Sequence, residues 1–204
     1  AGCGVGHTLI KLCDIGNRTG LGITVSEKEA EFASAQIGSE VKCRFMVACY
    51  DEAFDDGFDV IIAIESLKHS KNLQNTVINL INHLSANGKL IVIDDFSIST
   101  NKANALKFFL KRSWSISKLY STADIYEAVK CKGCQTKTID LTSYVVTSSY
   151  LLLLLKMGLL YFLFLISRPF KRNNVFGILF SGYFLEILFK RKLMKYLAVL
   201  LSKD

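Results

Sequence analysis

The sequence predicts an α/β protein built on a doubly wound, mostly parallel sheet. Two runs, residues 58–64 and 90–93, are almost continuously apolar and rich in β-branched side chains, as in strands buried on both faces of a parallel sheet. Segments of helical length separate the strand-like runs, and this alternation is typical of right-handed βαβ units. With 204 residues, 50% of them hydrophobic, the chain is long enough to form one domain around a real core.

Apolar spacing and helix start and stop residues place the elements of the first half. Strands are expected at residues 21–25, 41–48, 58–64 and 90–93, and helices at 6–15, 27–37 and 73–84. Ser26 is a suitable N-cap for the helix over 27–37, because Glu29 stands at its third position and completes a capping box. Asn87 and Gly88 are expected to end the helix over 73–84, and Gly133 marks a turn from helix to strand.

Charge is distributed unevenly along the chain, whose formal net charge is +7. Residues 1–150 hold 16 basic and 16 acidic residues, whereas residues 151–204 hold nine Lys or Arg and two Asp or Glu. The basic residues border long apolar runs instead of covering a polar face. This pattern favours a membrane surface or a hydrophobic partner over nucleic acid.

The chain begins Ala1-Gly2-Cys3-Gly4, without an initiator methionine or a signal-peptide pattern, so we expect it to be truncated at its N-terminus. Six scattered cysteines indicate reduced thiols and a cytoplasmic location. Cys131 and Cys134 form a single CxxC. A tetrahedral zinc site needs four ligands, and no second pair accompanies this one, so no metal is expected.

Sheets of this kind bind ligands at the carboxyl ends of their strands. The sequence places residues 2–6, 26, 49–51, 65–69 and 94–95 there. Gly2, Gly4 and Gly6 form a turn that leads into a helix N-terminus, where backbone can approach a ligand and free N–H groups point toward it. The dinucleotide-binding pattern would need a glycine at His7, so a cofactor loop and a plain tight turn both stay open at this point.

The order of these motifs resembles the class I S-adenosylmethionine-dependent methyltransferases, in particular the branch that methylates sugars, terpenoids, sterols and other small molecules. The resemblance is carried by Gly2-Cys3-Gly4-Val5-Gly6, Gly22-Ile23-Thr24-Val25-Ser26, Phe58-Asp59-Val60, Glu65-Ser66-Leu67-Lys68-His69, residues 84–88 and Ile93-Asp94-Asp95-Phe96. It covers residues 1–145 well and 183–203 weakly. It implies a Rossmann-like methyltransferase fold in which an acidic residue and the first, central strand precede the glycines.

The resemblance also implies a site for the cofactor S-adenosyl-L-methionine. The residues expected to bind it are Gly2, Cys3, Gly4, Gly6, Ser26, Asp51 and Glu65. The glycine loop would pack on the methionine part and Ser26 would reach the ribose hydroxyls, although members often have Gln where this chain has Glu29. Asp51 would lie near the adenine, and Cys49 is the alternative residue for this position. If Asp51 has no such role, it is a solvated carboxylate in a loop. Glu65 would lie near the sulfonium or make a structural hydrogen bond.

Two residues match catalytic positions of the family. His69, four residues after Glu65, matches a histidine that takes a proton from the substrate, and its ordinary pKa of about 6.5 suits that role. Asp95, before Phe96, matches an acidic residue that faces the acceptor in related sugar methyltransferases. His7 and His83 lack such a context, and we expect them to be structural or exposed.

Two long apolar runs, residues 151–166 and 175–189, lie in the C-terminal third, with basic clusters at 168–172 and 190–192. The resemblance places them between two strands of one sheet, at 136–141 and 196–201, so a single membrane span between those strands is topologically excluded. A lid over a lipophilic acceptor, a lid that also rests on a membrane, and an interface between copies of the chain are the three alternatives. The expected organisation is a core over 1–145, a hydrophobic helical insertion over 146–192, and a last strand over 193–204.

The predicted function is S-adenosylmethionine-dependent methyl transfer to a small, lipophilic acceptor, with O-methylation slightly favoured. The alternative is a non-catalytic cofactor-binding or membrane-associated subunit that acts through its hydrophobic C-terminal region.

Overall fold

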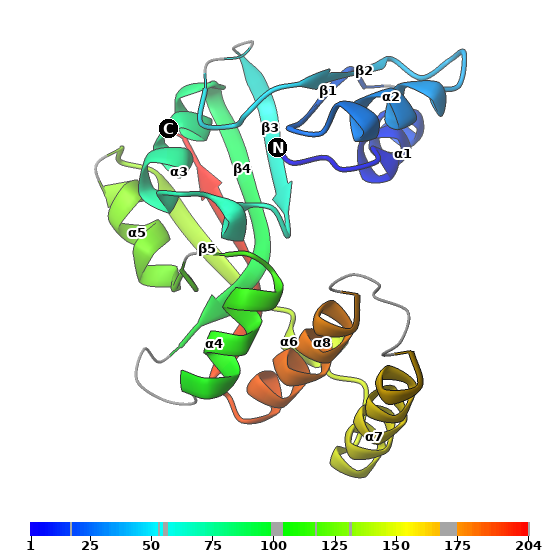
Figure 1. The fold of residues 1–204 in the computed structure, drawn as a ribbon. Helices are drawn as coiled ribbons and strands as arrows, with labels where there is room; N and C mark the ends of the chain where they lie inside the picture. The colour runs from blue at the N-terminus through cyan, green and yellow to red at the C-terminus, as the bar shows by residue number, and fades with distance from the viewer. Residues whose placement is uncertain are drawn as a thin grey trace. The chain divides into compact units, whose positions relative to one another are not determined.

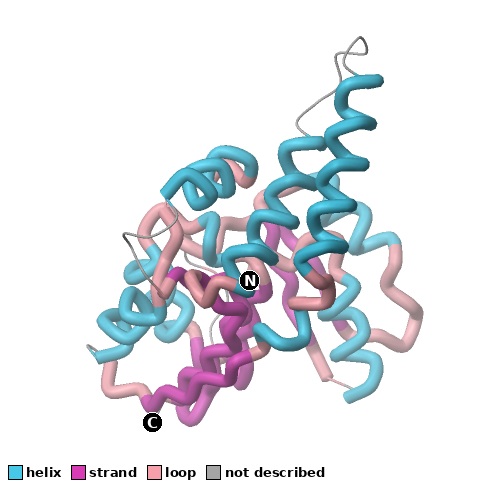
Figure 2. The backbone as a smooth tube through the Cα atoms, turned by 90° about the horizontal axis from the view of Figure 1, so that it is seen from below, coloured by secondary structure: helices cyan, strands magenta, loops and turns pink. Residues whose placement is uncertain are grey.

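The computed structural model describes residues 1–16, 18–52, 54, 57–98, 104–116, 118–130, 132–167 and 175–203. Helices and strands alternate along most of the chain (Figures 1 and 2). The elements in order are α1 (His7–Gly16), β1 (Gly20–Thr24), α2 (Glu27–Ala35), β2 (Cys43–Val47), β3 (Phe58–Ile64), the short 3-10 helix η1 (Leu67–His69), α3 (Leu73–Asn82), β4 (Leu84–Ser97), α4 (Asn104–Ser113), α5 (Thr122–Lys130), β5 (Gln135–Asp140), α6 (Thr142–Val145), α7 (Tyr150–Ser167), α8 (Val175–Lys190) and β6 (Met194–Ser202).

The described strands form two sheets, one with β1 beside β2 and the other with the order β3-β4-β6-β5. The β1–β2 and β3–β4 pairs are parallel. The α/β class is therefore confirmed. The strands expected at 136–141 and 196–201, on either side of the two apolar runs, correspond to β5 and β6, and these are neighbours in one sheet as expected. β1 and β3 belong to different sheets.

The chain divides into two compact units. Unit 1 comprises residues 1–94, 123–137 and 199–204, and unit 2 comprises residues 95–122 and 138–198. β4, β5 and β6 each contribute residues to both units.

Local signals in unit 1 fold as the sequence indicates. Ser26 is the N-cap of α2, and its Oγ accepts a hydrogen bond of 3.3 Å from the backbone N–H of Glu29. The reciprocal half of the predicted capping box is wrong, because the Glu29 carboxylate instead accepts a 2.7 Å hydrogen bond from Thr24 Oγ1. The turn at Gly133, with φ 67°, separates α5 from β5 as expected.

Two predictions about the central strands need correction. β3 is not buried on both faces: Val60 and Ile64 are 48% and 37% exposed, because this side of the strand borders a cavity. The helix predicted to reach residue 84 ends at Asn82, and β4 already begins at Leu84, which pairs with Phe58. Asn87 and Gly88 therefore lie inside a strand instead of ending a helix.

Unit 2 has its own hydrophobic core, formed where α4, α8 and the start of β6 meet. Leu110, Leu188, Phe189 and Met194 are buried at its centre. The backbone N–H of Ser148 donates a 2.7 Å hydrogen bond to Glu186 Oε1, which ties the chain before α7 to α8. None of the helices within the described residues combines the length and the apolar character that a membrane span requires.

Candidate active site

The glycine turn stands at the carboxyl end of β1, as predicted. The Cys3 N–H donates to the Ile23 carbonyl at 2.9 Å, and the Gly6 N–H donates to the Cys3 carbonyl at 3.0 Å, which closes the turn just before α1 begins. Burial raises the pKa of the Cys3 thiol, so this side chain is a neutral thiol at pH 7 and not a nucleophile.

The three glycines have positive φ angles but different surroundings. A Cβ on Gly2 would lie 2.5 Å from Ser66 Cβ, and a Cβ on Gly6 would lie 2.5 Å from the Phe45 ring. A Cβ on Gly4 would meet nothing within 4 Å. Gly2 and Gly6 therefore permit close packing within the protein, whereas Gly4 presents bare backbone to open space.

The end of β1 carries the polar groups expected to meet a ribose. Because the Ser26 Oγ accepts from the Glu29 N–H, its own hydroxyl hydrogen is available to donate to a ligand oxygen. Thr24, which is buried, holds the Glu29 carboxylate on the same strand end. Helix α2 thus begins with a hydroxyl and a carboxylate side by side.

Asp51 lies in the turn after β2, and its carboxylate accepts a short hydrogen bond from Thr76 Oγ1 on α3. The same turn is held from a second side, because the Tyr50 hydroxyl donates to the Ser66 carbonyl at 3.1 Å. Asp51 is exposed but bonded to α3, so it is not simply a solvated loop carboxylate.

Glu65 directly follows β3 and has a φ of 49°, a conformation that is uncommon for a residue other than glycine. Its backbone N–H donates to the Ile93 carbonyl at 2.8 Å, and its carboxylate, on a side chain that is 57% exposed, lies 3.6 Å from Lys68 Nζ. The backbone of Glu65 is thus held by its hydrogen bond to β4, while its carboxylate is exposed to solvent.

His69 closes the short helix η1, which is held in place by the buried carboxylate of Asp94. Asp94 Oδ2 accepts a 3.2 Å hydrogen bond from the Lys68 N–H, and Asp94 Oδ1 lies 3.5 Å from Lys68 Nζ. Partial burial lowers the pKa of His69 below 6.5, and the Lys68 charge lowers it further, against an opposing effect of Asp94. The imidazole is therefore largely neutral at pH 7 and able to accept a proton.

Asp95, the other predicted catalytic residue, is 6% exposed and belongs to unit 2. It follows Asp94 along β4, and successive side chains of a strand point to opposite faces. The two adjacent carboxylates are thus directed differently, and Asp94 is the one that holds η1.

The glycine turn and the loop that carries His69 are bonded to each other within unit 1. Ser66 Oγ donates to the Ala1 carbonyl at 3.0 Å, and Ser66 is also the residue against which Gly2 packs. The structure therefore brings together residues 2–6 and 65–69, which the sequence could only place at separate strand ends.

The other histidines are structural or exposed, as predicted. The buried His83 ring stacks on Phe54 at 4.0 Å, and its Nδ1 lies 2.8 Å from the Asn79 carbonyl. His7 is exposed and lies 2.7 Å from Gln36 Oε1. Cys131 of the CxxC lies outside the described residues, and no group of His, Cys, Asp or Glu among those described could hold a metal ion.

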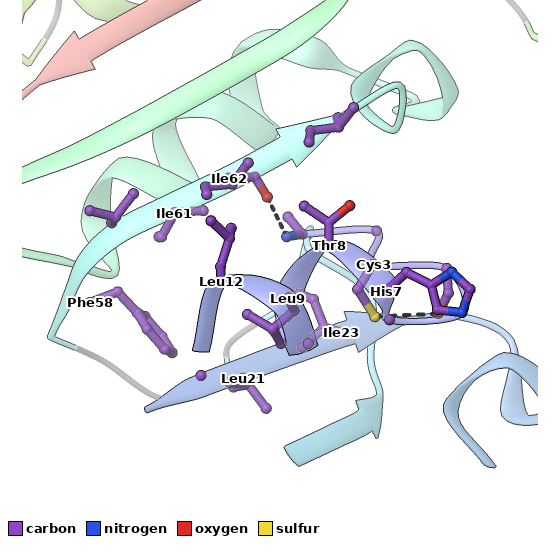
Figure 3. A pocket seen from close by; sticks show the side chains of 18 of the residues that line it. Cys3, His7, Thr8, Leu9, Leu12, Leu21, Ile23, Phe58, Ile61 and Ile62 are labelled. Atoms are coloured by element: carbon purple, nitrogen blue, oxygen red, sulfur yellow. Dashed lines mark hydrogen bonds between the residues drawn. The ribbon is translucent and has the colours of Figure 1, made fainter. Parts of the chain in front are cut away.

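A cavity of about 440 Å³ lies beside the glycine turn, between β1 and β3 (Figure 3). Leu21 and Ile23 of β1, Ile61 and Ile62 of β3, and Leu9 and Leu12 of α1 line it. Asp and Glu are absent from its described lining, so it offers no carboxylate to a ribose. Only its end at residues 2–6 coincides with the predicted cofactor loop; the remainder is lined by α1, β1 and β3.

The sequence did not single out three residues that organise the site: Ser66, Lys68 and Asp94. All three lie in motifs that were recognised, but their partners come from other elements. The alternation of side chains along β4 was an available signal that Asp94 and Asp95 have separate roles.

Residues 1–90 match the family model described as a methyltransferase domain. A sterol 4-C-methyltransferase of Caenorhabditis elegans is 35% identical over 98 residues, which cover 46% of this chain and 29% of that protein. A ubiquinone biosynthesis O-methyltransferase of Rickettsia akari (strain Hartford) is 27% identical over 149 residues, 68% of this chain and 58% of that protein. The chain thus spans less than two thirds of either curated relative.

Among solved structures, a geranyl diphosphate C-methyltransferase from Streptomyces coelicolor A3(2), in complex with Mg²⁺, geranyl diphosphate and S-adenosyl-L-homocysteine, superposes with a TM-score of 0.74. The identity is 14%, and the match covers 100% of this chain and 70% of that one. At this identity the likeness shows the fold alone, and that fold is the predicted one.

Proposed function

We propose that the chain belongs to the class I S-adenosylmethionine-dependent methyltransferases, whose domain model its residues 1–90 match, and that it transfers a methyl group to a small lipophilic acceptor. The observation that carries the proposal is the bonding of the glycine turn to the loop of His69 through Ser66. This bond places a loop suited to the cofactor next to a loop that carries a neutral imidazole.

The residues present fit S-adenosylmethionine. Gly4, with φ 51° and open space around it, lets the turn approach a ligand closely, and Ser26 has a hydroxyl hydrogen to donate. The Glu65 carboxylate, just after β3, lies on a side chain that is 57% exposed, where a negative charge favours a sulfonium. When bound, this cofactor supplies an electrophilic methyl group for an in-line displacement.

In such a displacement the protein mainly orients the acceptor and excludes water. A hydroxyl acceptor must also lose a proton, and we assign that proton to the His69 imidazole. The contacts of Lys68 with Asp94 position η1, the short helix that His69 ends. Asp95 is our candidate for the group that faces the acceptor.

The lipophilic nature of the acceptor is supported by the apolar helices α7 and α8 and by the relatives, one named for sterol and one for ubiquinone biosynthesis. We favour oxygen as the methylated atom because the imidazole of His69, the last residue of η1, is largely neutral and can accept a hydroxyl proton. A C-methylated acceptor would leave turnover much less dependent on His69.

Cofactor binding tests the proposal directly. The protein that contains this chain should bind S-adenosylmethionine and S-adenosylhomocysteine at micromolar levels in calorimetry. Gly4→Asp should abolish binding by filling the open space with a negative charge, whereas Gly4→Ala, the matched control, should weaken binding less because its methyl group meets no protein atom. NAD binding without S-adenosylmethionine binding would refute the assignment.

Methyl transfer is tested with a methyl-labelled cofactor and a panel of sterols, prenylated phenols and terpenoid diphosphates. Label recovered in one of these lipids supports the proposal. Tight cofactor binding without transfer to any lipid, sugar or amine acceptor would favour the non-catalytic subunit instead.

A further inference from the structure

Helix α7 of unit 2 exposes a continuous apolar stripe. Leu151, Leu154, Leu155, Leu159 and Phe162 follow the spacing i, i+3, i+4, i+8 and i+11, which places them on one face of the helix. Each of these five side chains is between 59% and 68% exposed. We refer to these residues as the α7 stripe.

The opposite face of α7 is also apolar, but it is packed. Leu153 and Leu160 are 1% and 8% exposed, and α7 contacts α8, which runs beside it (Figure 1). Lys156 on this side donates to Ser148 Oγ at 3.0 Å. A helix that is apolar on all sides is typical of a protein core or of lipid. Packing against α8 explains the apolar residues on one face of α7 but not those on the exposed face.

Positive charge adjoins the amino end of the stripe. Lys190 Nζ lies 5.2 Å from the centre of the Tyr150 ring, and Arg191 and Lys192, the next two residues, are exposed. The acidic Glu186 of α8 is engaged by the Ser148 N–H. The basic cluster at 168–172 lies outside the described residues.

The connections of the helix pair limit how it can meet a bilayer. β5 precedes α7 and β6 follows α8, and these two strands are neighbours in one sheet. The chain therefore returns to the strand beside the one it left, so the helix pair can rest on or dip into one leaflet without passing through.

We propose that the α7 stripe is a docking surface for a membrane rich in anionic phospholipid. The stripe inserts among the acyl chains near the headgroups, and Lys190, Arg191 and Lys192 contact the phosphates. An anionic surface is favoured because Lys190, Arg191 and Lys192 adjoin the stripe, while the nearby Glu186 already accepts a hydrogen bond from the Ser148 N–H. This inference does not depend on the cofactor or on the acceptor.

Vesicle cosedimentation tests the proposal on the protein that contains this chain. Binding to vesicles of phosphatidylcholine with 30% phosphatidylserine should exceed binding to pure phosphatidylcholine by about 100-fold at low salt, since each basic residue near such a surface contributes about five-fold. Concentrated salt should release most of the protein. Leu155→Ser with Leu159→Ser should lower binding about 100-fold.

Two further variants separate the contribution of the basic residues to membrane binding from that of the apolar stripe. Arg191→Gln with Lys192→Asn should lower binding to anionic vesicles by about 20-fold and leave binding to neutral vesicles unchanged. Phe108→Ser is the matched control, because Phe108 is 67% exposed on α4 of the same unit but lies outside the stripe. It should bind as the unmodified protein does.

Three results would overturn the proposal. The first is absence of binding to anionic vesicles, and the second is equal binding by the stripe variant and the Phe108→Ser control. The third is a dimer in light scattering that the stripe variant converts to a monomer, since a second copy would then cover the stripe. Because the substituted side chains are exposed, melting temperatures should be unchanged, which verifies that each variant is folded.

Discussion

Replacing Gly6 by alanine should destabilise the protein clearly more than replacing Gly4. Both glycines have positive φ angles, 81° for Gly6 and 51° for Gly4. An alanine Cβ at Gly6 would lie 2.5 Å from Phe45 Cζ and 2.8 Å from Ala33 Cβ, whereas at Gly4 it would meet nothing within 4 Å. The pair of variants thus shares the backbone penalty and differs in steric overlap.

The magnitude follows from these contacts. A left-handed conformation lowers the free energy of unfolding of an alanine variant by about 1–2 kcal/mol. The smaller conformational entropy of its unfolded chain raises the free energy of unfolding by about 0.4–1 kcal/mol. Both contributions are common to the two variants. Overlap with Phe45 and Ala33 adds about 1–3 kcal/mol to Gly6→Ala alone, as in other overpacked interiors. For a chain of this length, that difference corresponds to about 3–10 °C in melting temperature.

Urea denaturation of both variants measures the difference, provided that the slope of the unfolding free energy with urea is unchanged. A double-mutant cycle with Phe45→Leu adds a control, because a smaller side chain should relieve at least about 1 kcal/mol of the Gly6→Ala penalty. Equal stability of Gly6→Ala and Gly4→Ala, within about 0.5 kcal/mol, would refute the argument that Gly6 exists to admit Phe45.

Two further predictions concern ionisable groups. If His69 accepts the proton, His69→Ala should lower kcat by about 100-fold with little change in cofactor affinity, and the acid limb of kcat/KM for the unmodified protein should have its midpoint below pH 6.5. Asp94→Asn should move that acid limb to still lower pH, because the Asp94 charge raises the pKa of His69; an unmoved limb would show that this charge does not act on His69. Hydrogen bonds from Thr142 and Lys195 lower the pKa of Asp140 to about 2, so its contribution to stability is present above pH 4 and lost as the pH falls toward 2. Since Asp140 is 46% exposed, Asp140→Asn should cost only about 0.5–1 kcal/mol in urea unfolding at pH 7 and nothing near pH 2; a cost that is independent of pH would contradict this.

Features that depend on residues close together in the sequence were predictable. The apolar run of β3 defined the bounds Phe58–Ile64, and Ser26 capped α2, because a capping bond spans three residues. The glycine turn before α1 was also recognisable. The order of these local signals was sufficient to indicate the fold.

Tertiary structure decided how those pieces act together. Phe45 of β2 makes Gly6 a packing residue, while Gly4 stays open, and the bond of Lys68 to Asp94 joins residues 26 positions apart. Helix α7 shows the limit most plainly. Its sequence is apolar on every side, so no periodic signal distinguishes the buried Leu153 from the exposed Leu155, and only packing against α8 determines which face is left to meet a partner.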